Sequence, residues 1–116
     1  MVYLISHKAL RRKAVTMTDV EDRLRDALPK LSRLGAVVRF DLGKDGAWLV
    51  DASANNPTLS EDDGGDADAA CTIKITGENL IKLMDGKLDP MLGYTLGKIK
   101  VSGSMGVAMK LVGAIG

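Results

Sequence analysis

The chain has 116 residues, of which 46% are hydrophobic and 27% are charged, proportions typical of one globular domain. Its single cysteine, Cys71, excludes an internal disulfide and favours a reducing, cytoplasmic location. No apolar run approaches the roughly 20 residues that a membrane-spanning helix needs. The apolar run at residues 2–5 is too short for the core of a signal peptide.

The net charge of +1 is unevenly distributed along the chain. Residues 1–16 carry four basic side chains and no acidic one, whereas residues 17–116 carry 12 basic against 15 acidic side chains. A nucleic-acid-binding domain concentrates positive charge on its folded body. We therefore expect no nucleic-acid partner.

The basic N-terminal segment has two interpretations. Because it lacks acids and contains several apolar residues, it fits a membrane-surface or targeting segment. It also fits a loosely held extension, since chain ends are poorly ordered unless other contacts hold them. We favour the second interpretation, which divides the chain into a basic extension at residues 1–17 and a domain at residues 18–116.

The first helix is predicted from Thr18. Thr18 and Glu21 form a capping box, in which each side chain satisfies a free backbone amide. Pro29 is expected to kink the helix or to restart it, and Gly35 to end it. One apolar stripe at spacings of three and four follows the cap: Val20, Leu24, Leu28, Leu31 and Leu34.

The middle of the chain alternates with a period of two. Residues 37–42 and 47–51 predict two strands of a hairpin, joined by a tight turn at 43–46. Residues 55–69 show no period and contain five acids, but their spacing does not match a calcium-binding loop, so we expect a solvated acidic loop. Residues 71–76 predict a further strand.

Helix caps and glycines divide the C-terminal third. Thr76 is expected to cap a helix that ends at Gly86, and Asp89 to cap a short helix that runs through residue 96. A strand at 98–102 and a last helix capped by Ser104 follow. This order predicts an α+β fold. The apolar residues of the last helix are Met105, Ala108, Met109, Val112 and Ile115.

Met105 and Met109 are four residues apart on this last helix, so they share one face. We expect that face to point at the strand that carries Ile99 and Val101. Four of the six methionines lie between residues 84 and 109, over three predicted helices. Methionine adapts to irregular apolar partners, so these residues either fill a core or line an apolar pocket; composition alone favours the core.

Catalytic residues are scarce. The only histidine, His7, lies in the basic extension, and Cys71 occupies an inward strand position, so a nucleophile–base pair is not expected. Residues 103–106 miss the Gly-x-Ser-x-Gly pattern by one position. The glycines at 93–106 match no nucleotide-binding spacing. We expect a protein that is not an enzyme and that has no cofactor or metal.

Residues 85–111, DGKLDPMLGYTLGKIKVSGSMGVAMKL, resemble the C-terminal signature of sterol carrier protein 2 (SCP2) domains. That signature has an apolar-aromatic turn, Gly-Lys, an alternating strand, Gly, and an Ala-x-Lys-Leu helix. The resemblance extends over about residues 18–113. Tyr94 replaces a frequent Phe, and Ser104 and Ala70 each replace a frequent Asp. The acidic loop occupies the place of a third hairpin strand, so that edge strand is expected to be short or missing.

The resemblance implies helices packed on a largely antiparallel sheet of four to five strands, with an apolar tunnel between the layers. It implies binding and transfer of a fatty acid, fatty acyl-CoA, sterol or isoprenoid without catalysis. The Tyr94 hydroxyl and the Trp48 indole are expected to be polar handles. The expected lining residues are Trp48, Leu83, Met84, Met91, Tyr94, Leu96, Ile99, Val101, Met105 and Met109.

The alternative is an interaction module. In that interpretation the same apolar surface docks a partner enzyme or a second copy of the chain, and no lipid is carried. Contact with a membrane is expected to be transient at most.

A chain shortened to begin at Met17 tests the interpretation of the basic extension. If residues 1–16 do not pack on the domain, the shortened chain keeps the melting temperature and the lipid affinity of the full chain. The measurement is thermal unfolding followed by circular dichroism. A loss of several degrees would show that the extension stabilises the domain, because 1 kcal/mol shifts the midpoint of a domain of this size by roughly 4–8 °C.

Overall fold

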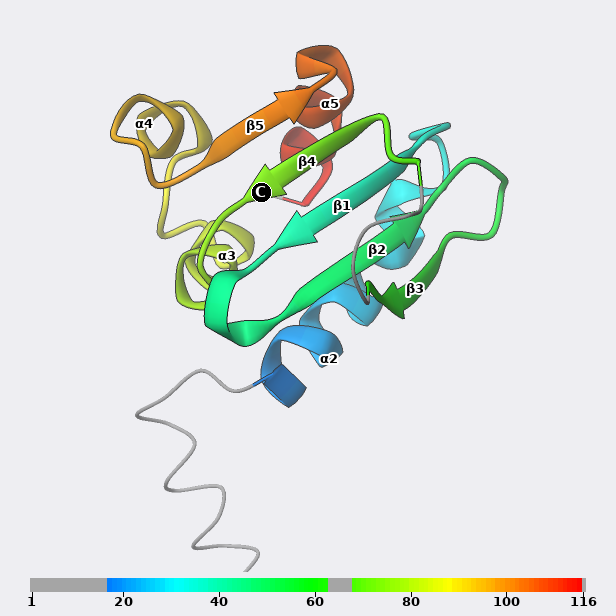
Figure 1. The fold of residues 1–116 in the computed structure, drawn as a ribbon, viewed down its shortest axis with the longest axis horizontal. Coiled ribbons are helices and arrows are strands. Elements are labelled where there is room, and N and C mark those ends of the chain that lie inside the picture. The colour runs from blue at the N-terminus through cyan, green and yellow to red at the C-terminus, as the bar shows by residue number, and fades with distance from the viewer. Residues whose placement is uncertain (1–16, 63–67, 116) are drawn as a thin grey trace, which may run out of the picture.

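The computed structural model describes residues 17–62 and 68–115 (Figure 1). A five-stranded sheet forms its centre, and the chain alternates between this sheet and short helices. The elements in chain order are α2 (Met17–Ala27), the 3-10 turn η1 (Leu28–Leu31), β1 (Val37–Asp41), the 3-10 turn η2 (Gly43–Asp45), β2 (Ala47–Asp51), β3 (Thr58–Glu61), β4 (Cys71–Lys74), α3 (Gly77–Met84), α4 (Pro90–Thr95), β5 (Lys100–Gly103) and α5 (Met105–Ile115).

The strands are ordered β3-β2-β1-β4-β5 in the sheet. The central strand β1 pairs antiparallel with β2 and parallel with β4, and the two outer pairings are also antiparallel. Phe40 therefore lies opposite Trp48 on one side and Ile73 on the other. The α+β class, the hairpin and the largely antiparallel sheet predicted from the sequence are confirmed.

The core lies between the sheet and the helices α2, α3 and α5, which cover one face of it (Figure 1). Alternate residues of the central strands face this layer, so that Val38, Phe40 and Ile73 are almost fully buried. Cys71 is 2% exposed, and burial raises the pKa of its thiol. The thiol is therefore the structural group expected from its inward position rather than a reactive one.

The N-terminal helix begins at Met17, so Thr18 lies within its first turn instead of preceding it. This differs by one residue from the expected cap. The α-helix ends at Ala27, and η1 carries the chain on as a 3-10 turn that has Pro29 in its first positions. The expected restart at Pro29 is confirmed, because the proline ring cannot continue the helical hydrogen bonds.

The other three predicted caps are confirmed. The Thr76 hydroxyl accepts a hydrogen bond from the Asn79 amide at 3.1 Å, and the Ser104 hydroxyl accepts one from the Val107 amide at 3.2 Å. The Asp89 carboxylate caps α4 by accepting from the Leu92 amide at 2.9 Å. Each cap satisfies an amide that the first turn leaves free, which fixes where α3, α4 and α5 begin.

Two strands differ from their expected positions. Residues 58–61 form the short edge strand β3 within the segment that was expected to lack structure; only Leu59 is buried there, so the sequence shows no period. Residues 63–67 of the acidic segment lie outside the described residues. Strand β5 begins at Lys100 instead of residue 98, because the amides of Lys98 and Ile99 both donate to the Gly93 carbonyl and close the end of α4.

The orientation expected for the last helix is wrong. Met105 and Met109 are 41% and 45% exposed, and they do not lie in the buried face. Leu111, which the sequence analysis left out of this face, is fully buried and takes part in a stripe at spacings of three and four. This stripe consists of Ala108, Leu111, Val112 and Ile115. Packing of α5 on η1 and β4 therefore turns both methionines outward.

Replacement of Gly103 by alanine is expected to destabilise the fold. Gly103 has a φ of +90°, and an added Cβ would lie 2.6 Å from the Ala70 carbonyl oxygen and 3.0 Å from the Cα of Cys71. Because neither backbone atom can move freely, we expect Gly103→Ala to lower the free energy of unfolding by about 1–3 kcal/mol in urea denaturation.

The matched control is Gly113→Ala, in α5. An added Cβ meets no atom within 4 Å there, and alanine favours a helix interior by up to about 1 kcal/mol. Equal unfolding free energies for the two variants would contradict the close approach of β5 to the start of β4.

Candidate functional site

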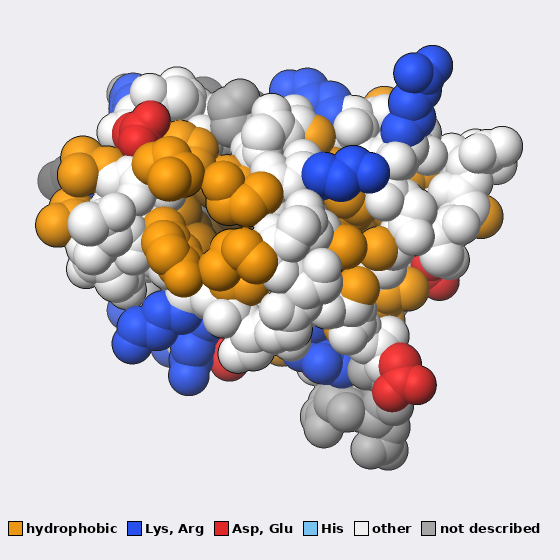
Figure 2. Space-filling view, turned by 90° about the horizontal axis from the view of Figure 1, so that it is seen from above, with side chains coloured by type: hydrophobic (Ala, Val, Ile, Leu, Met, Phe, Trp, Pro, Cys, Tyr) orange, Lys and Arg blue, Asp and Glu red, His pale blue; other side chains and the backbone are white. Residues whose placement is uncertain are grey.

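Six large apolar side chains are exposed on α4, at its C-terminal end and on α5. They gather on the face of the molecule where these helices lie (Figure 2). Folded monomers rarely expose a contiguous apolar surface of this kind unless it binds something. This α4–α5 patch consists of Met91, Leu92, Tyr94, Leu96, Met105 and Met109.

The patch arises from the way α4 packs. Gly93 is the buried residue of this helix, and an added Cβ would lie 2.9 Å from the Cδ1 of Ile99 and 3.4 Å from the Cγ of Leu88. The helix backbone therefore packs directly on these two side chains. Since the side of α4 that faces the core has no side chain of its own, its large apolar residues lie on the solvent side.

The ten residues expected to line a tunnel fall into three groups. Trp48, Leu83 and Ile99 are buried in the core, at 3% exposure or less, and Met84 and Val101 are half-buried against it. The other five lie on the patch: Met91, Tyr94, Leu96, Met105 and Met109. The structure thus divides the expected lining between the core and the surface.

The sequence analysis missed Leu92, which is 53% exposed and lies between two expected lining residues. Its apolar character beside Met91, on a helix that is too short to bury both, was the available signal.

The two expected polar handles lie at different places in the sheet. The Trp48 indole Nε1 is buried on β2 and has no hydrogen-bond partner in the part of the chain that the structure describes. Tyr94 is on α4, which precedes β5, and β1 and β4 separate β5 from β2. A single small polar group therefore has no position from which it meets both side chains.

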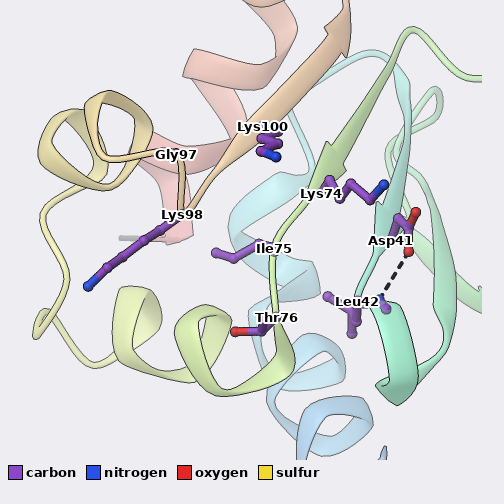
Figure 3. A pocket seen from close by; sticks show the side chains of 9 residues that line it. Asp41, Leu42, Lys74, Ile75, Thr76, Gly97, Lys98 and Lys100 are labelled. Atoms are coloured by element: carbon purple, nitrogen blue, oxygen red, sulfur yellow. Dashed lines mark hydrogen bonds between the residues drawn. The ribbon is translucent and has the colours of Figure 1, made fainter.

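A cavity of about 240 Å³ lies where β1 and β4 end and β5 begins (Figure 3). Its charged side chains are three lysines and one aspartate, and its apolar side chains are Leu42 and Ile75. The sequence did not indicate it, because the lysines come from two strands and a connection. The full lining is Asp41, Leu42, Gly43, Lys74, Ile75, Thr76, Gly97, Lys98 and Lys100. A smaller cavity of about 120 Å³ separates η1 from α5.

The carboxylates with a shifted pKa belong to structural contacts outside the patch. A hydrogen bond from Arg23 lowers the pKa of Asp85 and ties α2 to the end of α3. Hydrogen bonds from Ser53 lower the pKa of Asp51 after β2. Among residues 17–62 and 68–115, no three histidine, cysteine, aspartate or glutamate side chains form a group able to hold a metal ion.

Comparisons with known proteins agree on one family. A model of the SCP-2 sterol transfer family matches residues 17–116. Sterol carrier protein 2 of Gallus gallus is 35% identical over 86 residues, which are 70% of this chain and 15% of that protein. Hydroxysteroid dehydrogenase-like protein 2 of Homo sapiens is 31% identical over 98 residues, 83% of this chain and 23% of that protein. The chain thus spans under a quarter of these relatives.

The fold has the same relatives. The apo form of sterol carrier protein 2 from Yarrowia lipolytica superimposes with a TM-score of 0.69 at 21% identity, over 88% of this chain and 92% of that one. The SCP2 fold expected from the sequence is therefore confirmed. None of the helices in the described ranges is long and apolar enough to cross a membrane.

The exposure of the patch predicts the stability of alanine variants. Leu96→Ala and Met109→Ala remove side chains that are 59% and 45% exposed, so the free energy of unfolding should change by no more than about 0.5 kcal/mol. Ile99→Ala serves as the comparison, because Ile99 is 3% exposed and should cost about 2–5 kcal/mol. Chemical denaturation measures all three. A large loss for Leu96→Ala or Met109→Ala would show that the patch is part of the core.

Proposed function

Because this chain belongs to the SCP-2 sterol transfer family, we propose that it binds and transfers an apolar lipid and catalyses no reaction on it. The proposed ligands are fatty acids, fatty acyl-CoAs, sterols and isoprenoids. The exposed α4–α5 patch is the single observation that carries the proposal.

The chemistry of the patch suits a lipid chain. Burial of one methylene group contributes roughly 0.8 kcal/mol, so an apolar surface alone supplies affinity for a long chain. The three methionines of the patch add adaptability, because their unbranched side chains fit irregular apolar shapes. In this proposal the half-buried Met84 and Val101, with Leu83 and Ile99 behind them, form the inner wall.

The proposed lipid-binding residues are therefore those of the patch and of this inner wall. Trp48, on β2, lies outside the site as proposed, and whether the lipid enters a tunnel between the layers stays a prediction. The cytoplasmic location also stays a prediction, drawn from the single unpaired Cys71.

Titration with a fluorescent fatty-acid analogue tests the function directly. We expect saturable binding with micromolar or tighter affinity, and displacement by unlabelled fatty acid, acyl-CoA, sterol or isoprenoid. Native mass spectrometry of the gently purified protein separates the alternative, in which the patch docks a partner enzyme or a second copy. A lipid-free dimer together with no saturable binding to any of the four classes would overturn the proposal.

Polar substitution of the patch assigns the site. The double variant Met105→Gln/Met109→Gln keeps the approximate side-chain size but makes the α5 part of the patch polar, so lipid affinity should fall by about tenfold or more. The control is Leu49→Gln, at a half-buried position on β2 outside the patch, which should bind like the unaltered chain. Unchanged affinity in the folded double variant would place the lipid elsewhere.

A further inference from the structure

We propose that the 240 Å³ cavity at the ends of β1 and β4 is an anion subsite. In it, Lys74 and Lys100 hold the phosphate-bearing head of a lipid whose acyl chain lies on the α4–α5 patch. The inference rests on the proposed function and names the class of ligand: an amphiphile with an apolar chain and a phosphate group.

The first observation is the register of the sheet. Lys74 of β4 and Lys100 of β5 are direct cross-strand partners. Like charges in this arrangement repel each other and destabilise the pair of strands. An anion between the two ammonium groups removes that repulsion, so the pair is explained by a ligand better than by the stability of the sheet.

The second observation is that the charges near the cavity do not balance. Three lysines and one aspartate line it. The lysine ion pair in the described parts of the chain joins Lys82 to Glu78, so the cavity lysines remain without such a pair. Asp41 is the register partner of Lys74 on the other side, and its Oδ1 accepts a hydrogen bond from the Gly43 amide at 3.0 Å (Figure 3).

Two neighbouring groups are not counted as part of the subsite. The Lys98 side chain points away from Lys74 and Asp41, although the residue lines the cavity (Figure 3). The start of α3 already has a carboxylate, because a Cβ added at Gly77 would lie 2.6 Å from the Oδ2 of Asp45. The attraction for an anion therefore comes from Lys74 and Lys100.

The third observation is the position of the cavity beside the patch. Gly97 and Lys98 line the cavity and directly follow Leu96, which is 59% exposed on the patch. Basic side chains also border the apolar surface in Figure 2. A ligand with its chain on the patch can thus place its head in the cavity without crossing the core.

The size and charge of the cavity identify the head group. Pockets for whole drug-sized ligands measure about 300–1,000 Å³, so a cavity of about 240 Å³ suits a head group and not a complete lipid. A phosphate monoester carries close to two negative charges and three strong acceptor oxygens, which match two ammonium groups better than one carboxylate does.

The test compares two lipids that share one chain. Palmitoyl lysophosphatidic acid carries a phosphate, and monopalmitoylglycerol lacks it. At low ionic strength, below the concentration at which either forms micelles, we expect the phosphate lipid to bind about three- to tenfold more tightly. The double variant Lys74→Gln/Lys100→Gln should abolish this preference and keep the affinity for monopalmitoylglycerol.

The matched control is Lys30→Gln/Lys110→Gln, which removes the same charge from the smaller cavity and should keep the preference. Equal affinities for the two lipids, or equal losses in both double variants, overturn the subsite and leave lipid binding intact. If neither lipid binds, the proposed function itself fails.

Inorganic phosphate and glycerol 3-phosphate test a free phosphate as the source of the anion. Each should compete only at millimolar concentration, since neither has a chain to contact the patch. Saturable micromolar binding of either one, with amide shifts at residues 74 and 100 and no preference for the phosphate lipid, would overturn the assignment to a lipid head group.

Discussion

The double pairing of β1 is the interaction on which the rest of the structure depends. This strand accepts β2 as an antiparallel neighbour and β4 as a parallel one, so it joins the N-terminal hairpin to everything that follows. A parallel neighbour requires a long connection, which the edge strand β3 and the acidic segment provide. As a result, β5 and the helices around it gather at the opposite edge of the sheet from β3.

That edge combines two properties that the remainder of the molecule lacks. Residues 86–116 carry four lysines against Asp89 alone, while residues 17–85 carry eight basic and 14 acidic side chains. The same C-terminal part holds all six exposed large apolar side chains of the described residues. Positive charge and apolar surface therefore occur together, as an amphiphilic ligand of opposite charge requires.

Local signals predicted most of the fold. The caps at Thr76, Asp89 and Ser104 depend on residues three positions apart, and the alternation of the first hairpin depends on neighbours two positions apart. The sequence contains these relations directly. Strand β3 was missed because its one buried residue, Leu59, gives no repeat from which a period can be read.

The site was less predictable because it depends on packing between distant segments. The outward position of Met105 and Met109 follows from the burial of Leu111 against η1 and β4, and an apolar helix permits several rotations about its axis. The pairing of Lys74 with Lys100 requires the register of two strands 26 positions apart in the chain. Composition identified the apolar residues correctly, but it did not determine which of them would be exposed.

Exposed methionines make the patch sensitive to oxidants. Met91, Met105 and Met109 are each more than 40% exposed, so peroxide reaches their sulfur atoms without unfolding, whereas Met84 packs against the core. Oxidation to methionine sulfoxide converts a flexible apolar side chain into a polar one. The surface that this fold leaves uncovered therefore keeps its apolar character only under reducing conditions, and methionine sulfoxide reductases can restore it once it is lost.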